Sequence, residues 1–387
     1  MAYILDVNDF DNYKDLFLYS FNYNDSLQAD TFLKKLFKQS IVYGIKNNND
    51  LIASITNTSF QSNFFGKKFN VGGIGNVMSA PENTKNNSID LLMEQSFKDM
   101  YDNKVTLSYL APFSYDYYRR FGYEQVFEKT NIEIPFSKTI NVKESSNIRI
   151  KRCDFSEAEN LIGDIYERNN TFGGVKRDSW YWNNRPIWFN REHLAVAYDK
   201  AEEVKGYIIY YFQNKNMIID DFVWEDPQVF LSIFHFINKH RSMFEFLIIK
   251  STDSNLKPIC FTSNPSDANT TISPYMMARI VNLSAFMNNY PFQKHNLDEI
   301  IIDVSDSLVW NNNSWKLKIN NGQISFVETN NSRTDIFINI QTLTKAMFGF
   351  QSLKDSFMMG NVGGDLNKIN ELDSTFIKNQ AKLKESF

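Results

Sequence analysis

The sequence predicts a mixed α/β protein of two or three domains, and three observations support this. The chain has 387 residues, more than a single hydrophobic core usually organises. Stretches with the two-residue periodicity of strands alternate with stretches whose apolar residues recur every three or four positions, as in helices. Hydrophobic residues make up 43% of the chain and include 34 Phe, which is enough to fill sizeable cores.

The first region, residues 1–146, is expected to form an α/β layer. Asn and Asp at 47–50 tolerate the left-handed backbone of a hairpin turn. The expected elements are helices at 11–19 and 26–40, a hairpin at 41–58, a second hairpin containing Gly66, strands at 71–79 and 105–110, and a helix between these two strands.

The segment from the first of these two strands to the helix is the most informative part of the chain. Residues 71–79 are apolar with interspersed glycines, which suits a strand that another backbone or a ligand approaches closely. Pro81 ends the strand, and Ser88 is expected to cap the helix. The loop at 82–87 would bring backbone N–H groups to the helix N-terminus, where the positive dipole favours an anion such as a pyrophosphate.

The second region, residues 147–288, repeats this order of elements. Strands are expected at 148–151, 193–198, 206–213, 217–223 and 246–250, with helices at 156–167 and from Pro227. The repeated order indicates an internal structural duplication. Trp180, Trp182 and Trp188 lie near Arg185 in this region. Packing against a neighbouring domain is favoured for them over a ligand-binding box.

The third region, residues 289–387, has a cluster of strands followed by helices, as in a small α+β domain. The strands are expected at 299–304, 315–319, 322–328 and 334–340, and the helices at 342–348, 352–359, 367–372 and in the tail.

Composition excludes several classes of function. A net charge of −4 gives no reason to expect nucleic acid or an anionic membrane as a partner. The two cysteines, Cys153 and Cys260, do not make a disulfide framework and indicate a reducing compartment. The four His show no metal-site spacing, so no metal is expected. Without a signal peptide or a membrane-spanning stretch, a cytoplasmic location is expected.

Several motifs resemble one family. They are the strand and Pro81 loop with its helix, the turn Tyr118-Arg119-Arg120-Phe121-Gly122-Tyr123, the stretches RDSWYWNNR, YMMARIVN and WNNNSWKLKI, and a chain that ends on Phe387. Together they resemble the GNAT acetyltransferases of the Eis (enhanced intracellular survival) family over nearly the whole chain. The resemblance implies tandem GNAT-like domains, the second one diverged, followed by a sterol-carrier-protein-like α+β domain. It also implies a homo-oligomer, often a hexamer.

The resemblance further implies transfer of an acetyl group from acetyl-CoA to an amine such as an aminoglycoside, a polyamine or a lysine side chain. An amine attacks the thioester only when neutral, so a base must take its proton and an acid must protonate the leaving thiolate. By resemblance, Tyr118 is the acid and the free carboxylate of Phe387 is the base. Backbone N–H groups of Val77, Met78 and Ser79 would polarise the thioester carbonyl. Asp25 and Glu385 are candidates for drawing a cationic amine into the cleft.

The pyrophosphate loop departs from the family's pattern of Arg or Gln, two residues, Gly, one residue, then Gly or Ala. The corresponding residues here are Thr84, Lys85, Asn86, Asn87, Ser88 and Ile89. Backbone N–H groups could still hold phosphate, with charge from Lys85 or Lys67. Two interpretations therefore stay open: a working acetyltransferase with a looser cofactor loop, and a catalytically impaired GNAT-like binding or assembly module.

Overall fold

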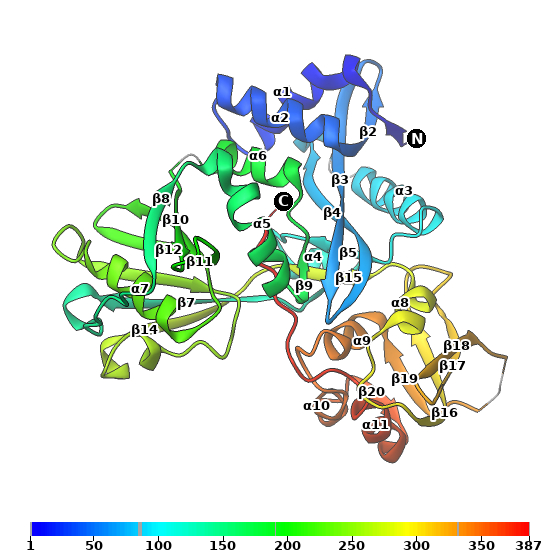
Figure 1. The fold of residues 1–387 in the computed structure, drawn as a ribbon. Coiled ribbons are helices and arrows are strands. Elements are labelled where there is room, and N and C mark those ends of the chain that lie inside the picture. Colours follow the sequence, from blue (N-terminus) through cyan, green and yellow to red (C-terminus); the bar gives the residue numbers. More distant parts are fainter. Residues whose placement is uncertain (1, 84–86, 190, 331–332, 387) are drawn as a thin grey trace.

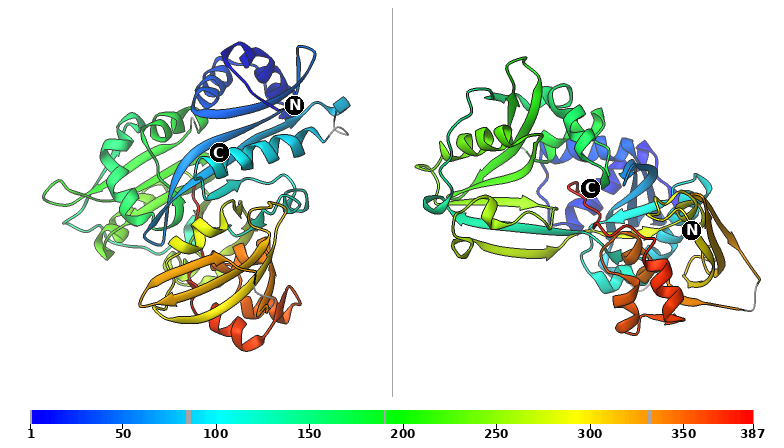
Figure 2. Two further views of the ribbon diagram at one scale, coloured as in Figure 1. Left: turned by 90° about the vertical axis from the view of Figure 1, so that its right-hand side faces the viewer. Right: turned by 60° about the horizontal axis from the view of Figure 1, so that its bottom comes forward.

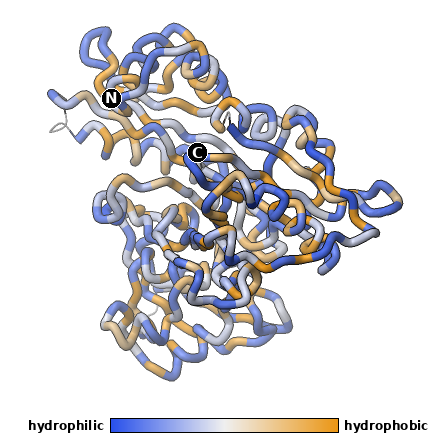
Figure 3. Tube along the Cα trace, turned by 90° about the vertical axis from the view of Figure 1, so that its left-hand side faces the viewer, coloured by the Kyte–Doolittle hydropathy of each residue, from blue (hydrophilic) through white to orange (hydrophobic). Residues whose placement is uncertain are grey.

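The computed structural model describes residues 2–83, 87–189, 191–330 and 333–386, and within them the strands form three separate sheets (Figure 1). All three sheets pack against helices, so the predicted mixed α/β class is confirmed. In Figure 3 hydrophobic and hydrophilic positions alternate along much of the chain, and several of the loops at the periphery are hydrophilic.

The first sheet has the strand order β1-β2-β3-β4-β5-β15-β6, and β9 pairs with β3. Its parallel pair, β4 and β5, is joined through α3, because adjacent parallel strands need a crossover connection. The elements up to β6 are β1 Tyr3–Ile4, η1 Val7–Asp9, α1 Phe10–Ser20, α2 Leu27–Gln39, β2 Ser40–Asn47, β3 Asp50–Phe64, β4 Lys67–Ser79, η2 Pro81–Asn83, α3 Ser88–Asp102, β5 Leu107–Leu110, α4 Tyr115–Arg119 and β6 Glu124–Gln125.

The two faces of the first sheet carry different helices because strand residues alternate between faces. Val42 and Met78 pack in one core cluster with residues of α1 and α2. Tyr43 and Ile74 pack in another with residues of α3.

The second sheet has the order β14-β7-β13-β12-β11-β10-β8, and its parallel pair, β12 and β13, is joined through α7. This repeats the arrangement of β4, α3 and β5, as the duplicated sequence pattern predicts. The elements are β7 Glu128–Pro135, η3 Phe136–Lys138, β8 Arg149–Cys153, η4 Phe155–Glu157, α5 Ala158–Asn169, β9 Phe172–Val175, α6 Ser179–Trp188, β10 His193–Tyr198, β11 Val204–Gln213, β12 Asn216–Trp224, α7 Pro227–Asn238, β13 Phe246–Ser251, η5 Pro258–Cys260, η6 Pro265–Asp267, β14 Asn269–Pro274 and β15 Met277–Ile280.

The first two sheets exchange strands. β7 follows the first sheet in the sequence but pairs with β13 and β14 in the second. β15 follows the second sheet but inserts between β5 and β6 in the first. The second sheet therefore contains β7, which directly follows the strands of the first sheet in the sequence. The first sheet contains β15, which follows the strands of the second.

The third sheet has the order β18-β17-β16-β19-β20 and carries the last helices, as predicted for an α+β unit. Its elements are α8 Leu283–Asn289, β16 Leu297–Ser305, β17 Asn313–Asn320, β18 Gln323–Glu328, β19 Ile336–Asn339, α9 Ile340–Met347, α10 Leu353–Met358, β20 Val362–Gly364 and α11 Leu366–Asp373. Trp310 lies here but donates from Nε1 to the backbone oxygen of Val281 (2.8 Å) and packs on Tyr101 of α3, so this part contacts the first sheet.

The chain after α11 leaves the third sheet and runs between the other two, as the red segment of Figures 1 and 2 shows. The prediction of a helical tail is wrong, because residues 377–386 form no helix. The tail is extended and makes backbone bonds to neighbouring parts of the chain instead: the amide of Ala381 donates to the oxygen of Phe348 (2.8 Å) and that of Lys382 to the oxygen of Phe172 (2.7 Å). We call residues 377–386 the tail below.

A second prediction, that Ser88 caps α3, is also wrong. Asn87 is the N-cap, in the left-handed conformation (φ 51°), and Ser88 is the first helical residue and is buried. The strands β1, β6, β7, β9, β14, β15 and β20 were not predicted. Most are too brief to show a periodicity, but β7 and β14, with eight and six residues, are long enough to show one and were missed. No helix among the described residues combines the length and the apolar character needed to cross a bilayer.

Candidate active site

A gap opens between the parallel strands β4 and β5. They pair only from Val71 to Ile74 on β4, and β4 then continues to Ser79 against β3 alone. The amide of Ala80 donates to the oxygen of Ile52 on β3 (2.9 Å). Since amides alternate along an extended strand, that of Ser79 points away from β3 and into the gap, and that of Met78 points back toward β3. Val77 lies in a bulge beside Asn76, whose φ is 44°. Of the predicted oxyanion donors, the amide of Ser79 therefore faces a space in which a thioester carbonyl could lie.

The N-terminus of α3 lies after the same strand, and no side chain of a described residue caps it. Asn87 makes no side-chain hydrogen bond to the first turn, so the first amides of the helix keep their capacity to bind an anion. Ile89 is buried in the same core cluster as Ile74 and Tyr118. Thr84, Lys85 and Asn86 lie outside the described residues.

Lys67 cannot supply charge to this loop. It begins β4, twelve residues before Ser79, which corresponds to roughly 40 Å of extended strand. Arg120 is a cation at the right place that the sequence did not indicate. It pairs with Asp90 in the first turn of α3 (2.6 Å) and lies over the rings of Tyr117 and Phe121. Arg120 thus ties the tyrosine turn (residues 118–123) to the N-terminus of α3.

Tyr118 lies on α4, directly after β5, and is 2% exposed. Its ring packs edge-on against Phe113 (5.4 Å between centroids) and Tyr117 (5.2 Å). No atom of the described residues forms a hydrogen bond with its hydroxyl. Burial raises the pKa of Tyr118, and Tyr117 and Tyr123 add to the effect. The phenol therefore holds its proton at neutral pH, as a general acid must.

The tyrosine turn is held from below by a buried arginine. Gly122 has φ +80°, and a Cβ there would lie 1.6 Å from Nη1 of Arg279. Arg279, on β15, is fully buried and pairs with Asp306 from the third part of the chain (2.7 Å). Gln341 of α9 adds a bond from Nε2 to the backbone oxygen of Arg119 (2.9 Å). The turn therefore depends on residues far away in the sequence.

The end of the tail approaches the tyrosine turn through Tyr275. The hydroxyl of Tyr115 donates to the backbone oxygen of Tyr275 (3.0 Å), and the hydroxyl of Tyr275 donates to the backbone oxygen of Glu385 (2.5 Å). Tyr115 is on the same short helix as Tyr118. Phe387 lies outside the described residues.

A buried ionic cluster anchors the tail. Glu385 accepts from Tyr166 (2.7 Å) and from Nε of Arg177 (2.8 Å), and Arg177 also pairs with Asp221 (2.7 Å). Lys384 bonds the other oxygen of Asp221 (2.6 Å). Burial alone would raise the pKa of Asp221, but Lys384 and Arg177 outweigh it and hold the pKa well below its ordinary value.

This cluster rules out one predicted role. Glu385 is fully buried and paired with Arg177, so it does not offer a free carboxylate to a cationic amine. Asp25 is exposed and pairs with Lys14 (2.9 Å). Of the tryptophans predicted to pack against a neighbouring domain, Trp188 does so, since its ring contacts Phe32 of α2 (6.0 Å). Trp182 packs instead inside its own domain, against Tyr166 of α5.

The second sheet has the same gap without the same helix terminus. β12 and β13 pair from Asn216 to Ile219 on β12 and then separate. The carboxylate of Asp226 accepts from the amides of Gln228 (2.7 Å) and Val229 (3.1 Å) at the start of α7. These amides are therefore closed to an outside anion, whereas those of α3 are not.

Comparisons with known proteins agree with this arrangement. Residues 5–126 and residues 173–280 each match a sequence profile described as an acetyltransferase (GNAT) domain. Residues 283–383 match a profile described as a sterol carrier protein domain. The predicted order of two GNAT-like domains and a sterol-carrier-protein-like domain is confirmed. No curated protein matches the chain at the level of sequence.

Among solved structures, the chain is similar to a conserved protein of unknown function from Enterococcus faecalis, a probable N-acyltransferase. The two are 27% identical, with 100% of this chain and 99% of that chain covered and a TM-score of 0.95. The chain described here also has the fold of a GCN5-related N-acetyltransferase from Anabaena variabilis (16% identity, 100% of both chains, TM-score 0.88). The same fold is found in Eis1 from Mycobacterium abscessus (15% identity, 100% of both chains, TM-score 0.82).

Proposed function

This chain belongs to the GNAT acetyltransferase family, in an Eis-like arrangement of two such domains and a sterol carrier protein domain, and on that premise we propose that it transfers the acetyl group of acetyl-CoA to an amine. The acyl donor of this family is an acyl-CoA. One observation carries the proposal: the gap between β4 and β5 lies beside the buried Tyr118 and the N-terminus of α3, which no described side chain caps.

In the proposed reaction, the amide of Ser79 stabilises the oxyanion that forms when the amine attacks the thioester. Tyr118 then gives its proton to the sulfur of the leaving CoA. The pyrophosphate is held by the amides that begin α3, at Ser88 and Ile89, together with Asn87 and the loop from Thr84 to Asn86. Arg120 supports this role because it neutralises Asp90 in the first turn of α3, a carboxylate that would otherwise repel the pyrophosphate.

The base that takes the proton from the amine is proposed to be the carboxylate of Phe387. The support is the course of the tail, whose last described residues are bound to Tyr275 beside α4. An α-carboxyl ordinarily titrates at about pH 3.3 to 3.7, so the carboxylate is ionised at neutral pH.

The acceptor is proposed to be a primary amine of an aminoglycoside, a polyamine or a lysine side chain. Because Glu385 is paired with Arg177, attraction of a cationic amine would rest on other carboxylates than this one. A cytoplasmic location, assembly as a homo-oligomer such as a hexamer, and domain limits at 1–146, 147–288 and 289–387 stay predictions.

Calorimetry with acetyl-CoA tests the proposal directly. Saturable heat is expected, and the affinity for acetyl-CoA should fall when the charge of Arg120 is removed in Arg120→Met. Loss of a charged hydrogen bond costs about 1.5 to 3 kcal/mol, or roughly tenfold to hundredfold in affinity. An absence of heat at millimolar acetyl-CoA would instead favour the binding or assembly module, which the changed loop residues allow.

A further inference from the structure

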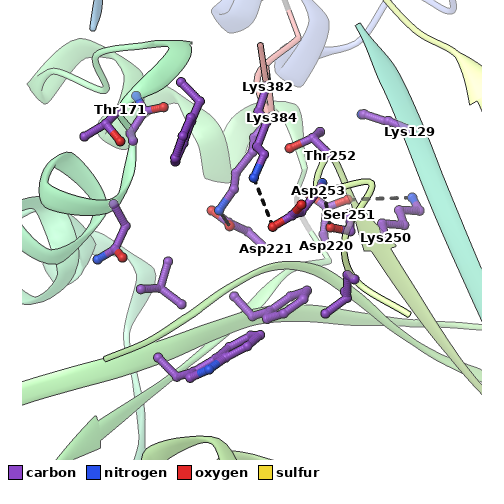
Figure 4. A pocket seen from close by; sticks show the side chains of 17 residues that line it. Lys129, Thr171, Asp220, Asp221, Lys250, Ser251, Thr252, Asp253, Lys382 and Lys384 are labelled. Atoms are coloured by element: carbon purple, nitrogen blue, oxygen red, sulfur yellow. Dashed lines mark hydrogen bonds and ion pairs between the residues drawn. The ribbon is translucent and has the colours of Figure 1, made fainter. Parts of the chain in front are cut away.

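The gap in the second sheet contains a cavity of about 270 Å³ that the proposed reaction does not use. It lies where β12 and β13 separate, and the tail closes one side of it with Lys382 and Lys384 (Figure 4). Open α/β sheets bind ligands at the carboxyl ends of strands, where neighbouring strands part. The topology of the fold therefore makes the gap between β12 and β13 a candidate ligand site.

The size of the cavity and the closed terminus of α7 favour a compact ligand over a nucleotide. The cavity is slightly smaller than the roughly 300 to 1,000 Å³ of ordinary small-molecule sites. Its lining on β12 ends at Trp224 and does not include the amides that begin α7, which Asp226 already occupies. A ligand here therefore has no free helix N-terminus for a pyrophosphate.

One end of the cavity is cationic. Lys129 of β7 and Lys250 of β13 share a sheet face, because Lys250 pairs with Asn131, two residues from Lys129. Lys250 has partners of its own in the hydroxyl of Tyr211 (2.7 Å) and the carboxylate of Asp220 (3.7 Å).

Lys129 is the exception among the four lysines of the cavity. Lys384 pairs with Asp221 (2.6 Å) and Lys382 with Asp253 (3.0 Å). In the parts of the chain that the structure describes, Lys129 has neither an ion pair nor a hydrogen-bonded acceptor for its ammonium group. It lies over the ring of Tyr275 (3.7 Å to the centroid), and burial lowers its pKa.

The aspartates cannot supply the missing partner, because each is already engaged. Asp220 is shared with Arg185 (2.9 Å) and Asp221 with Arg177 (2.7 Å). Lys129 is half-buried, and its ammonium group has no compensating anion among the described residues. It is therefore the lysine of this cavity with which a ligand carboxylate can pair.

The other end of the cavity is aromatic. Phe222 and Trp224 pack against the core cluster that includes Ile249, and their rings stack with centroids 5.2 Å apart and planes 4° apart. Lys250, the next residue of β13, and Lys129 therefore lie on the opposite face of the sheet. Residues of both faces line the cavity, so it passes through the gap between β12 and β13, with a cation on one side and an aromatic surface on the other.

We propose that this cavity binds a small, elongated organic carboxylate, with its carboxylate on Lys129 and its apolar body along Phe222 and Trp224. No residue that lines this cavity is assigned to acetyl transfer, although Lys129 contacts Tyr275, which holds the end of the tail beside α4. Saturating CoA should leave binding at this cavity unchanged.

Titration calorimetry on the full chain, with CoA present throughout, tests the proposal with three probes. Octanoate carries both the charge and the body, 1-octanol carries the body alone, and inorganic phosphate carries charge alone. Octanoate is expected to bind saturably and at least tenfold more tightly than either of the others. No saturable heat from octanoate, or phosphate binding as tightly as octanoate, overturns the proposal.

Variants locate the binding. Lys129→Met is expected to weaken octanoate by about tenfold to hundredfold, the effect of losing a charged partner. Lys129→Arg, which keeps the charge, and Lys138→Met, an exposed lysine just beyond β7, should both bind as the unaltered protein does. Equal binding by Lys129→Met and the unaltered protein overturns the assignment. If Lys129→Met fails to fold, the comparison of the three probes decides.

Discussion

The hydroxyl of Tyr118 is positioned by packing alone, without a hydrogen bond from any described residue. Its ring is fixed by Phe113 and Tyr117, and burial keeps the proton on the oxygen. A hydroxyl with no hydrogen-bond partner among the described residues is available to a substrate sulfur. This separates its role in catalysis from any role in stability.

The Tyr118→Phe variant tests that separation. Loss of the acid should lower kcat for acetyl transfer by about 10² to 10⁴-fold, while thermal stability stays unchanged because no described bond is lost. Steady-state kinetics with acetyl-CoA and a polyamine measure the first effect, and a thermal melt the second. Tyr101→Phe, which keeps the packing on Trp310, is the matched control. Full activity in Tyr118→Phe would remove this residue from the mechanism.

Two glycines with nearly the same backbone angle should respond very differently to alanine. Gly122 (φ +80°) lies against Arg279, whereas Gly66 (φ +84°) has no atom within 4 Å of an added Cβ. Gly66→Ala should cost only the backbone term of about 1 to 2 kcal/mol. Gly122→Ala should add about 1 to 3 kcal/mol from overpacking. Midpoints of urea unfolding compare the two, and equal midpoints would show that Arg279 moves aside freely.

At the scale of elements, the tail is the segment whose conformation was predicted wrongly: it is extended, whereas a helix was expected. Its residues alternate between buried and half-buried from Ala381 to Ser386, the pattern of an extended chain with neighbours on one side. A helix was predicted here because the tail follows three helices, α9, α10 and α11. The extended form is stable because Phe348, Phe172 and Asp221, all distant in sequence, supply its partners.

The anchoring of the tail should depend on pH through Asp221. Its folded pKa is depressed, so its contribution to stability is complete above its unfolded pKa of about 3.9 and is lost as the pH falls toward the folded value. Unfolding by urea between pH 7 and pH 3 should show a steep loss below pH 4 in the unaltered protein. The Asp221→Asn variant should be less stable at pH 7 and show a smaller loss.

Asp102→Asn serves as the control, because Asp102 forms an exposed pair with Lys98 on α3 and such pairs contribute little. A slope below pH 4 that is the same in Asp221→Asn and the unaltered protein would mean that other carboxylates govern the acid transition.

At the scale of the whole molecule, the third part of the chain supports the candidate active site. Asp306 holds Arg279 beneath Gly122, and Gln341 holds the backbone of Arg119. The sterol carrier protein domain therefore bears on the position of Tyr118, whatever else it binds.

The Asp306→Asn variant should reveal this coupling. It leaves Arg279 as an uncompensated buried charge, which typically costs about 3 to 5 kcal/mol, and it should lower kcat because the tyrosine turn loses its support. Thermal melts and kinetics measure the two effects. Glu299→Gln, in a half-exposed pair with Lys316 (3.7 Å), should change neither. Unchanged kcat in a destabilised Asp306→Asn would confine Asp306 to stability.

The sequence predicted what local patterns encode. The strands around Gly72, the helix with its apolar face at Leu92 and Met93, and the turn at Tyr118 are all confirmed as elements. It did not predict Arg279 beneath Gly122 or Arg120 beside Asp90, because these contacts join segments with no shared periodicity. The roles of Tyr118, Phe387 and the loop from Thr84 to Ile89 stay predictions.

The exchange of β7 and β15 has a consequence for how the protein is made on the ribosome. The first sheet cannot be completed until Met277–Ile280 has been synthesised, about 150 residues after β6. At ~5 to 20 residues per second this is a wait of roughly 8 to 30 s. Throughout it, the nascent chain exposes the unpaired edge of β5, a template for misassociation. We therefore expect the two acetyltransferase-type domains to fold together as one unit during synthesis. A chain truncated between them should not fold, and the nascent chain should need a chaperone to cover the edge of β5 until β15 is made.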